Sequence, residues 1–275
     1  MSWPQKIFTY DPSNKSHTFA GRAPLLITLV LIFAALVTAT ISGFVGMAGG
    51  MALLGVMSAL MAPAEVVPLH GIVQLASNFT RTLVFLRHVA WRIFLVYALP
   101  LSLGVWLAAQ IWSGDRLDWF KPVVGLFILL FLLWRRFSPR LRNVPLWSYA
   151  PLGAVVGFAT IFVGATGPLI APFFLRDDMN KEQIIATKAV CQSWGHTLKI
   201  PAFLTLGFDY LTHWQLLVAL LLAVMVGTLI GKRLLGRMSR GVFDIIYQSI
   251  LALISLYLII SGLTWVERRQ AMRHG

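Results

Sequence analysis

The chain has 275 residues, of which 58% are hydrophobic and only 12% are charged. Soluble domains carry roughly a quarter charged residues, so this composition excludes an ordinary soluble domain and predicts an all-α polytopic membrane protein. The formal net charge is +13, but the basic residues gather at the ends of apolar segments, which indicates anchoring by the positive-inside rule and no nucleic-acid partner.

Eight apolar segments are long enough to cross a bilayer, which takes about 17 to 25 helical residues. Two shorter apolar segments, at 49–61 and 167–175, follow runs of small residues. We expect these two to form half-helices or re-entrant hairpins. The eight long segments lie at 25–44, 66–87, 92–112, 119–136, 147–163, 180–204, 214–233 and 243–263.

A basic linker at 137–146 divides the apolar part of the chain into two halves. The first transmembrane repeat is expected to cover 21–136 and the second 147–264. Residues 1–20 are polar and lack the apolar core of a signal peptide, so we expect an N-terminal tail there and a C-terminal tail at 265–275. This organisation predicts a multi-pass protein of the bacterial inner membrane.

The two halves align with one another at a fixed offset of 118 residues. The run GMAGG at 46–50, the first glycine break, corresponds to GATGP at 164–168, the second glycine break. Each break precedes a segment that carries four polar side chains. A duplicated unit of this kind is typical of transporters built from two repeats. The matched pairs are Gly46 with Gly164, Gly49 with Gly167, His70 with Lys188, Gln74 with Gln192, Asn78 with His196, and Arg81 with Lys199.

Three basic clusters, in the loops near residues 90, 138 and 236, constrain the topology. All three clusters can lie on the cytoplasmic side only if the chain crosses the membrane once in the region of the second glycine break. In that case the two halves form an inverted repeat. If both glycine breaks are re-entrant loops, the repeat is parallel and the last cluster lies outside. We favour the inverted repeat, against which only the basic tail at 268–273 argues.

Each half carries four polar side chains on one helix face, because offsets of 4, 8 and 11 residues fall within an arc of about 80°. A charged side chain near the bilayer centre costs about 2.5 to 3.5 kcal/mol, so such a face is expected to line a wet cavity. The alternatives are snorkelling of Arg81 and interhelix bonds of the glutamines. We name His70, Gln74, Asn78 and Arg81 the first polar stripe, and Lys188, Gln192, His196 and Lys199 the second polar stripe.

The two polar stripes contain cationic and amide side chains and no carboxylate. A cation site would need negatively charged oxygens, whereas these side chains offer hydrogen-bond donors, so we expect a small anion as the guest. The single cysteine, Cys191, provides no thiol cage for a metal. We expect no metal ion and no cofactor.

The glycine breaks are also compatible with binding of a small anion. The half-helix after a break exposes free backbone N–H groups and the positive end of its dipole, and glycine lets an anion approach the backbone closely. Tight packing of helices through small residues is the alternative. The glycines expected at the anion site are Gly46, Gly49, Gly50, Gly164 and Gly167.

The chain resembles the TauE/SafE family of sulfite exporters in two runs of residues. The first is SGFVGMAGGMALLGVMSALMAP, which leads into a polar-faced helix, and the second is the corresponding run GATGPLIAPFFL in the second half. The resemblance covers roughly residues 25–263. It implies a helical two-repeat transporter that exports sulfur-containing anions such as sulfite, sulfoacetate or other organosulfonates.

These features predict an anion transporter that works by alternating access around a central site. His70 and His196 could bond the anion, carry coupling protons or simply link helices, and uniport would need no titrating group. The expected roles of the others are charge neutralisation by Arg81, Lys188 and Lys199, and orientation by Gln74, Gln192 and Asn78.

Two alternatives remain beside the transporter. An intramembrane hydrolase could use Thr166 or Ser193 with His196, but such a site needs a nucleophile and a base within hydrogen-bond reach. A membrane scaffold or assembly protein would need no substrate site at all. The apolar perimeter also permits a homodimer.

Overall fold

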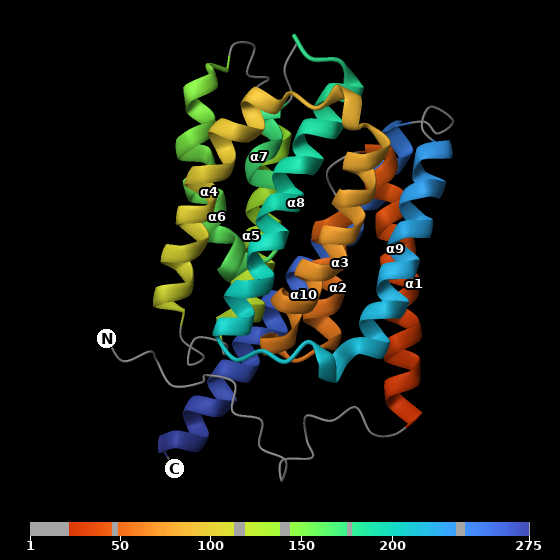
Figure 1. Ribbon diagram of the computed structural model, residues 1–275. Helices are drawn as coiled ribbons and strands as arrows, with labels where there is room; N and C mark the ends of the chain where they lie inside the picture. The colour runs from red at the N-terminus through yellow and green to blue at the C-terminus, as the bar shows by residue number, and fades with distance from the viewer. Residues whose placement is uncertain are drawn as a thin grey trace.

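The computed structural model describes residues 22–45, 49–112, 119–137, 144–174, 178–234 and 240–274. Within these ranges the regular structure is helical, with ten α-helices and three short 3-10 turns (Figure 1). The first half contains α1 (Arg22–Val45), α2 (Gly49–Leu60), α3 (Pro63–Val84), α4 (Trp91–Ile111) and α5 (Phe120–Phe137). The second half contains α6 (Tyr149–Val163), α7 (Gly167–Phe174), α8 (Lys181–Thr205), α9 (Trp214–Leu234) and α10 (Arg240–His274).

Every segment predicted from the apolar pattern corresponds to one of these helices, and the two short segments correspond to α2 and α7. The largest difference lies at the C-terminal end, where α10 continues through the expected tail as far as His274. The residues WVERRQAMRH that follow Thr264 are mostly good helix formers, without glycine or proline, so nothing in them ends the helix.

Four of the described helices are long and apolar enough to cross a membrane, namely those at Leu25–Ser42, Trp91–Ile111, Leu146–Val163 and Leu211–Leu234. Shorter apolar helices lie at Gly49–Leu60, Phe120–Trp134 and Leu251–Thr264. The helices α3 and α8 belong to neither set, and these are the helices that carry the polar stripes. Composition therefore separates the pair of central helices from the apolar ones around them.

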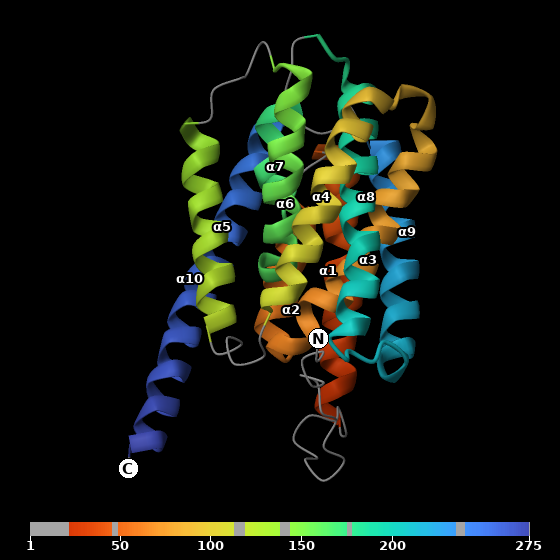
Figure 2. The same cartoon turned by 60° about the vertical axis from the view of Figure 1, so that its left-hand side comes forward.

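Equivalent helices of the two halves run in opposite directions. In Figure 1, α3 rises from the lower to the upper end, whereas α8 descends. The same opposition holds between α4, which descends, and α9, which rises, and between α5 and α10 (Figure 2). The closest helix pairs join the two halves. The helix α1 packs on α9 and α6 packs on α4, while α3 contacts α8 and α5 contacts α10.

The interior of the helix bundle is mostly apolar but also holds polar and charged side chains. Large apolar side chains cover the perimeter, and Leu99 on α4, for example, is 79% exposed. The two lysines of the second polar stripe, Lys188 and Lys199, are by contrast buried in the interior. A bilayer requires this distribution, since its core offers no hydrogen bonds to polar groups.

The helices α4 and α6 approach so closely that glycine is required between them. A Cβ atom at Gly157 would lie 2.1 Å from the Leu101 carbonyl oxygen, and one at Gly153 would lie 2.3 Å from that of Tyr97. Small residues at such contacts are the usual means by which membrane helices pack. This pair of helices is therefore a rigid element of the structure.

We expect Gly157→Ala to lower the thermal unfolding midpoint of the detergent-purified protein, because the new methyl group overlaps backbone and overpacking typically costs about 1–3 kcal/mol. Gly195→Ala on α8 is the matched control, since its Cβ would lie 3.6 Å from the nearest heavy atom, on Leu101. The control should be neutral or slightly stabilising. Equal midpoints for the two variants would show that α4 and α6 do not pack this tightly.

Candidate functional site

The two halves meet around a small internal cavity of about 20 Å³. A cavity of this size holds about one water-sized molecule. Its lining comes from α1, α2, α3, α8 and the second glycine break. The lining residues are Ser42, Gly50, Met51, His70, Gln74, Asn78, Arg81, Ala165, Gly167, Gln192 and His196.

The cavity brings most of the predicted site residues together. The whole first polar stripe lines it, as do Gln192 and His196 of the second polar stripe and two of the predicted glycines. Lys188 and Lys199 are buried nearby but do not line it. Gly46 lies outside the described residues. The cavity thus gathers most of the residues predicted for the anion site, while Lys188 and Lys199 lie outside its lining.

The start of α2 packs directly on the first polar stripe. The Nε2 atom of His70 lies 2.8 Å from the carbonyl oxygen of Gly50. A Cβ atom at Gly50 would lie 2.9 Å from Oε1 of Gln74, so only glycine leaves that amide its place. Gly49 packs the other way, onto α1, where a Cβ atom would lie 1.8 Å from the Thr38 carbonyl oxygen. The packing thus requires glycine at both Gly49 and Gly50. Gly50 makes room for a side chain of the first polar stripe, whereas Gly49 allows α2 to pack closely on α1.

Arg81 is fixed by a serine one helical turn earlier. Its Nε atom donates to the Ser77 carbonyl oxygen at 3.2 Å, and a terminal guanidinium nitrogen donates to the Ser77 hydroxyl at 3.1 Å. That hydroxyl lies 3.3 Å from the Thr228 hydroxyl on α9. A spacing of four residues on a helix brings such side chains together, so the Ser77–Arg81 contact could have been read from the sequence, whereas the contact with α9 could not.

Lys199 caps the second glycine break. Its ammonium donates to the carbonyl oxygen of Gly164, which ends α6 and has a φ of +88°. That left-handed conformation favours glycine, which explains this residue at the break. The backbone N–H of Gly164 in turn donates to the Thr160 carbonyl oxygen at 3.2 Å. Lys199 thus satisfies the free carbonyl at the end of α6.

Basic side chains gather around the cavity. Arg81, His70 and His196 line it, and Lys188 and Lys199 are buried nearby. The rings of His70 and His196 lie edge to face, with centroids 6.1 Å apart. No carboxylate is among the residues lining the cavity, and no His, Cys, Asp and Glu cluster in the described ranges could hold a metal. Such surroundings favour an anion.

Three lining residues were not predicted, namely Ser42, Met51 and Ala165. Ser42 stands one helical turn before the first glycine break and matches Thr160 at the offset of 118 residues. That match was a usable signal for a small polar residue at the break. Met51 and Ala165 are apolar, and no chemical pattern distinguishes them from the rest of the chain.

The family model of the sulfite exporter TauE/SafE matches residues 31–258. The chain belongs to the TauE/SafE family. This confirms the resemblance found in the sequence and makes the chain a member of a family of membrane exporters of sulfite and related sulfur anions. No curated protein and no solved structure matches the chain.

TauE/SafE proteins are transporters and not enzymes, which sets the hydrolase alternative aside. The geometry agrees with this. The hydroxyl of Ser193 and Nδ1 of His196 are both buried, and neither has a hydrogen-bond partner among the described residues. The two therefore do not form the bonded nucleophile and base that such chemistry needs.

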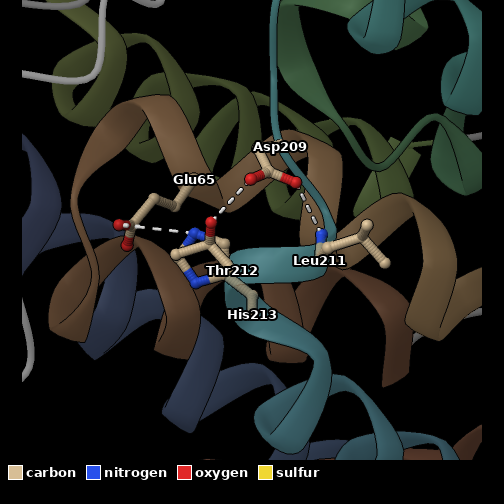
Figure 3. A network of polar contacts seen from close by, with 5 residues as sticks. All are labelled: Glu65, Asp209, Leu211, Thr212 and His213. Carbon is tan, nitrogen blue, oxygen red and sulfur yellow. Dashed lines mark hydrogen bonds and ion pairs between the residues drawn. The ribbon is translucent and has the colours of Figure 1, made fainter.

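The halves of this TauE/SafE protein also touch at both ends of the central helices. At the upper end of Figure 1, the backbone N–H of Ala90 donates to the Thr187 hydroxyl on α8 at 2.9 Å. At the lower end, Glu65 on α3 lies 3.9 Å from Nε2 of His213, just before α9 (Figure 3). A polar contact between the halves thus lies on each side of the cavity.

Asp209 holds the turn that presents His213. It accepts hydrogen bonds from the Thr212 hydroxyl at 2.8 Å and from the Leu211 backbone N–H at 2.9 Å (Figure 3). These bonds hold the pKa of Asp209 below its ordinary value of 3.8, so the carboxylate is ionised at neutral pH.

Proposed function

We propose that this protein exports sulfite or a small organosulfonate across the bacterial inner membrane by alternating access around the cavity. One observation supports this most strongly. Side chains from both halves line a common buried cavity that contains Arg81 and two histidines and no carboxylate. Such groups cost free energy in a membrane interior. Pairing with a bound anion would offset this cost and explain why the groups are there.

The opposed directions of equivalent helices support an inverted repeat in the membrane. Described basic residues stand at the upper end of Figure 1, in the turn between α3 and α4 and in the last turns of α5 and α9. By the positive-inside rule that end faces the cytoplasm. The basic residues late in α10 lie at the opposite end, so this orientation is set by the loops between the helices. A homodimer through the apolar perimeter would be compatible with it.

The charged and amide groups have distinct roles in this proposal. Arg81 supplies fixed charge, since a guanidinium can donate two N–H bonds to two oxygens of the same oxyanion. Gln74 and Gln192, one from each half, orient the anion from opposite sides. Lys188 and Lys199 raise the local potential from behind the lining. His70 and His196 bond the anion, and a role in proton coupling would use the same imidazoles.

A sulfur anion is larger than the cavity of about 20 Å³, so binding requires the helices around the cavity to move apart on one side at a time. The contacts at the two ends would then alternate. The Ala90–Thr187 bond closes the upper end and the Glu65–His213 contact closes the lower end.

Weakening one end should therefore expose the cavity from that end. Ser42→Cys in a Cys191→Ala background places a thiol in the lining. We expect Thr187→Val to raise its labelling by a maleimide from the upper side, and Glu65→Gln to raise it from the lower side, each by about fivefold for a contact of about 1 kcal/mol. Oriented vesicles separate the two sides. Labelling that rises on the same side in both variants would exclude alternating access about these contacts.

Ligand-induced thermal stabilisation tests the proposed function. Purified protein is heated with sulfite, sulfoacetate, taurine, sulfate, acetate or chloride at constant ionic strength. We expect sulfite or a sulfonate to stabilise the protein in a concentration-dependent way, by about 2.7 kcal/mol at a hundred times its Kd. Exchanging sodium for choline should change nothing. Equal shifts with every salt, or a shift that follows the cation, would contradict an anion site.

A further inference from the structure

Asn78 lines the cavity and has a buried acceptor atom without a partner in the described part of the chain. Its Nδ2 atom donates to the Gln74 carbonyl oxygen at 2.8 Å. A carbonyl oxygen can only accept, so this bond fixes which end of the amide is the NH₂ group. The Oδ1 atom is buried and has no hydrogen-bond partner among the described residues. Asn78 lines the cavity and is itself almost fully buried.

His70 presents a second acceptor by the same reasoning. Its Nε2 atom lies 2.8 Å from the Gly50 carbonyl oxygen, so Nε2 carries the hydrogen. In the neutral ring, Nδ1 is then an acceptor. It is buried and likewise lacks a partner in the described part of the chain. His70 also lines the cavity and has 0% exposure.

Two buried acceptors without a partner call for a ligand that donates. An unsatisfied buried polar atom is costly, and a site built around it rejects a ligand that lacks the matching group. A fully deprotonated oxyanion such as sulfate has only acceptors, so its oxygens would be repelled by Asn78 Oδ1 and could not hydrogen-bond to it. An oxyanion that keeps one O–H can place its charge toward Arg81 and its hydrogen toward Asn78 or His70.

We propose that the cavity selects a singly charged oxyanion that carries its own hydroxyl group, so that sulfite is taken up by the site as hydrogen sulfite. This rests on the proposed function and narrows it. No covalent step is involved, since the proton stays on the ligand oxygen while it is bound. The competing explanation is a water molecule that donates to the same acceptors, and in that case a hydroxyl on the anion would bring no advantage.

Two isosteric sulfonates separate these explanations. Hydroxymethanesulfonate and ethanesulfonate have the same charge and nearly the same size, and differ by a hydroxyl in place of a methyl group. We expect the purified protein to bind the hydroxylated anion at least about tenfold more tightly, by calorimetry or thermal stabilisation. In Asn78→Leu this ratio should fall toward one. Equal affinities in the unmodified protein would overturn the inference.

The pH dependence of sulfite binding gives a second test that needs no variant. As the pH rises and hydrogen sulfite loses its proton, the affinity for total sulfite should fall, although the dianion carries more charge. Ethanesulfonate, which does not titrate in this range, corrects for any titration of the protein. An affinity that rises with deprotonation would overturn the inference. If neither sulfite nor either sulfonate binds, the proposed function itself fails, whereas binding without these preferences removes only the selectivity.

Discussion

Arg81→Gln should lower the affinity for the transported anion by at least about 30-fold, because removing one partner of a buried charge pair costs about 2–5 kcal/mol. Arg81 is the only guanidinium in the lining of the cavity. Its two bonds to Ser77 hold it in place. Glutamine keeps some hydrogen-bonding capacity and removes the charge. Sulfite flux into proteoliposomes measures the loss.

Arg87→Gln is the matched control for this prediction. It makes the same change of charge at an exposed position in the turn between α3 and α4. Flux through this variant should equal that of the unmodified protein. If both variants lose flux alike, the net charge of this end of the molecule matters and the cavity arginine does not. If Arg81→Gln transports normally, the anion does not pass Arg81.

Lys199→Met should lower the stability of the folded protein. The ammonium of Lys199 satisfies the Gly164 carbonyl oxygen, and both residues are buried. Methionine has a similar length and no donor. The carbonyl would then be buried without a partner, at a cost of about 1–3 kcal/mol. Thermal unfolding of the purified protein checks the expected fall in midpoint.

Lys232→Met, at the exposed end of α9, serves as the control, because it removes a lysine whose ammonium lies 5.9 Å from the centre of the Phe85 ring and satisfies no buried carbonyl of the described residues. Its midpoint should stay close to that of the unmodified protein. Lys199→Gln, which keeps a donor, should recover part of the loss. An unchanged midpoint for Lys199→Met would show that the lysine does not hold the second glycine break, and would return it to its predicted role beside the anion.

The fold was largely predictable because the apolar segments and the offset of 118 residues are properties of the chain itself. The lining of the cavity was predictable in part for the same reason. Gln74 and Gln192 lie on the inner faces of α3 and α8, where the helical period places them. The glycine breaks were recognisable from residue type alone.

The position of Lys199 was not predictable from spacing. The stripe places its Cα on the correct face, but the long side chain reaches the end of α6, whose position follows from tertiary packing. The contact of Ser77 with Thr228 depends in the same way on how α9 lies beside α3. The length of α10 was missed because its last residues are polar, and polarity was taken to end the helix.

The central claim is that the two polar stripes enclose the anion between the halves. The most direct measurement is an experimental structure of the protein with selenite, an oxyanion of the same shape as sulfite whose selenium scatters anomalously. The account predicts one selenium peak in the cavity, between Arg81 and the imidazoles of His70 and His196. A peak at another place, or none in a protein that still transports selenite, would contradict it.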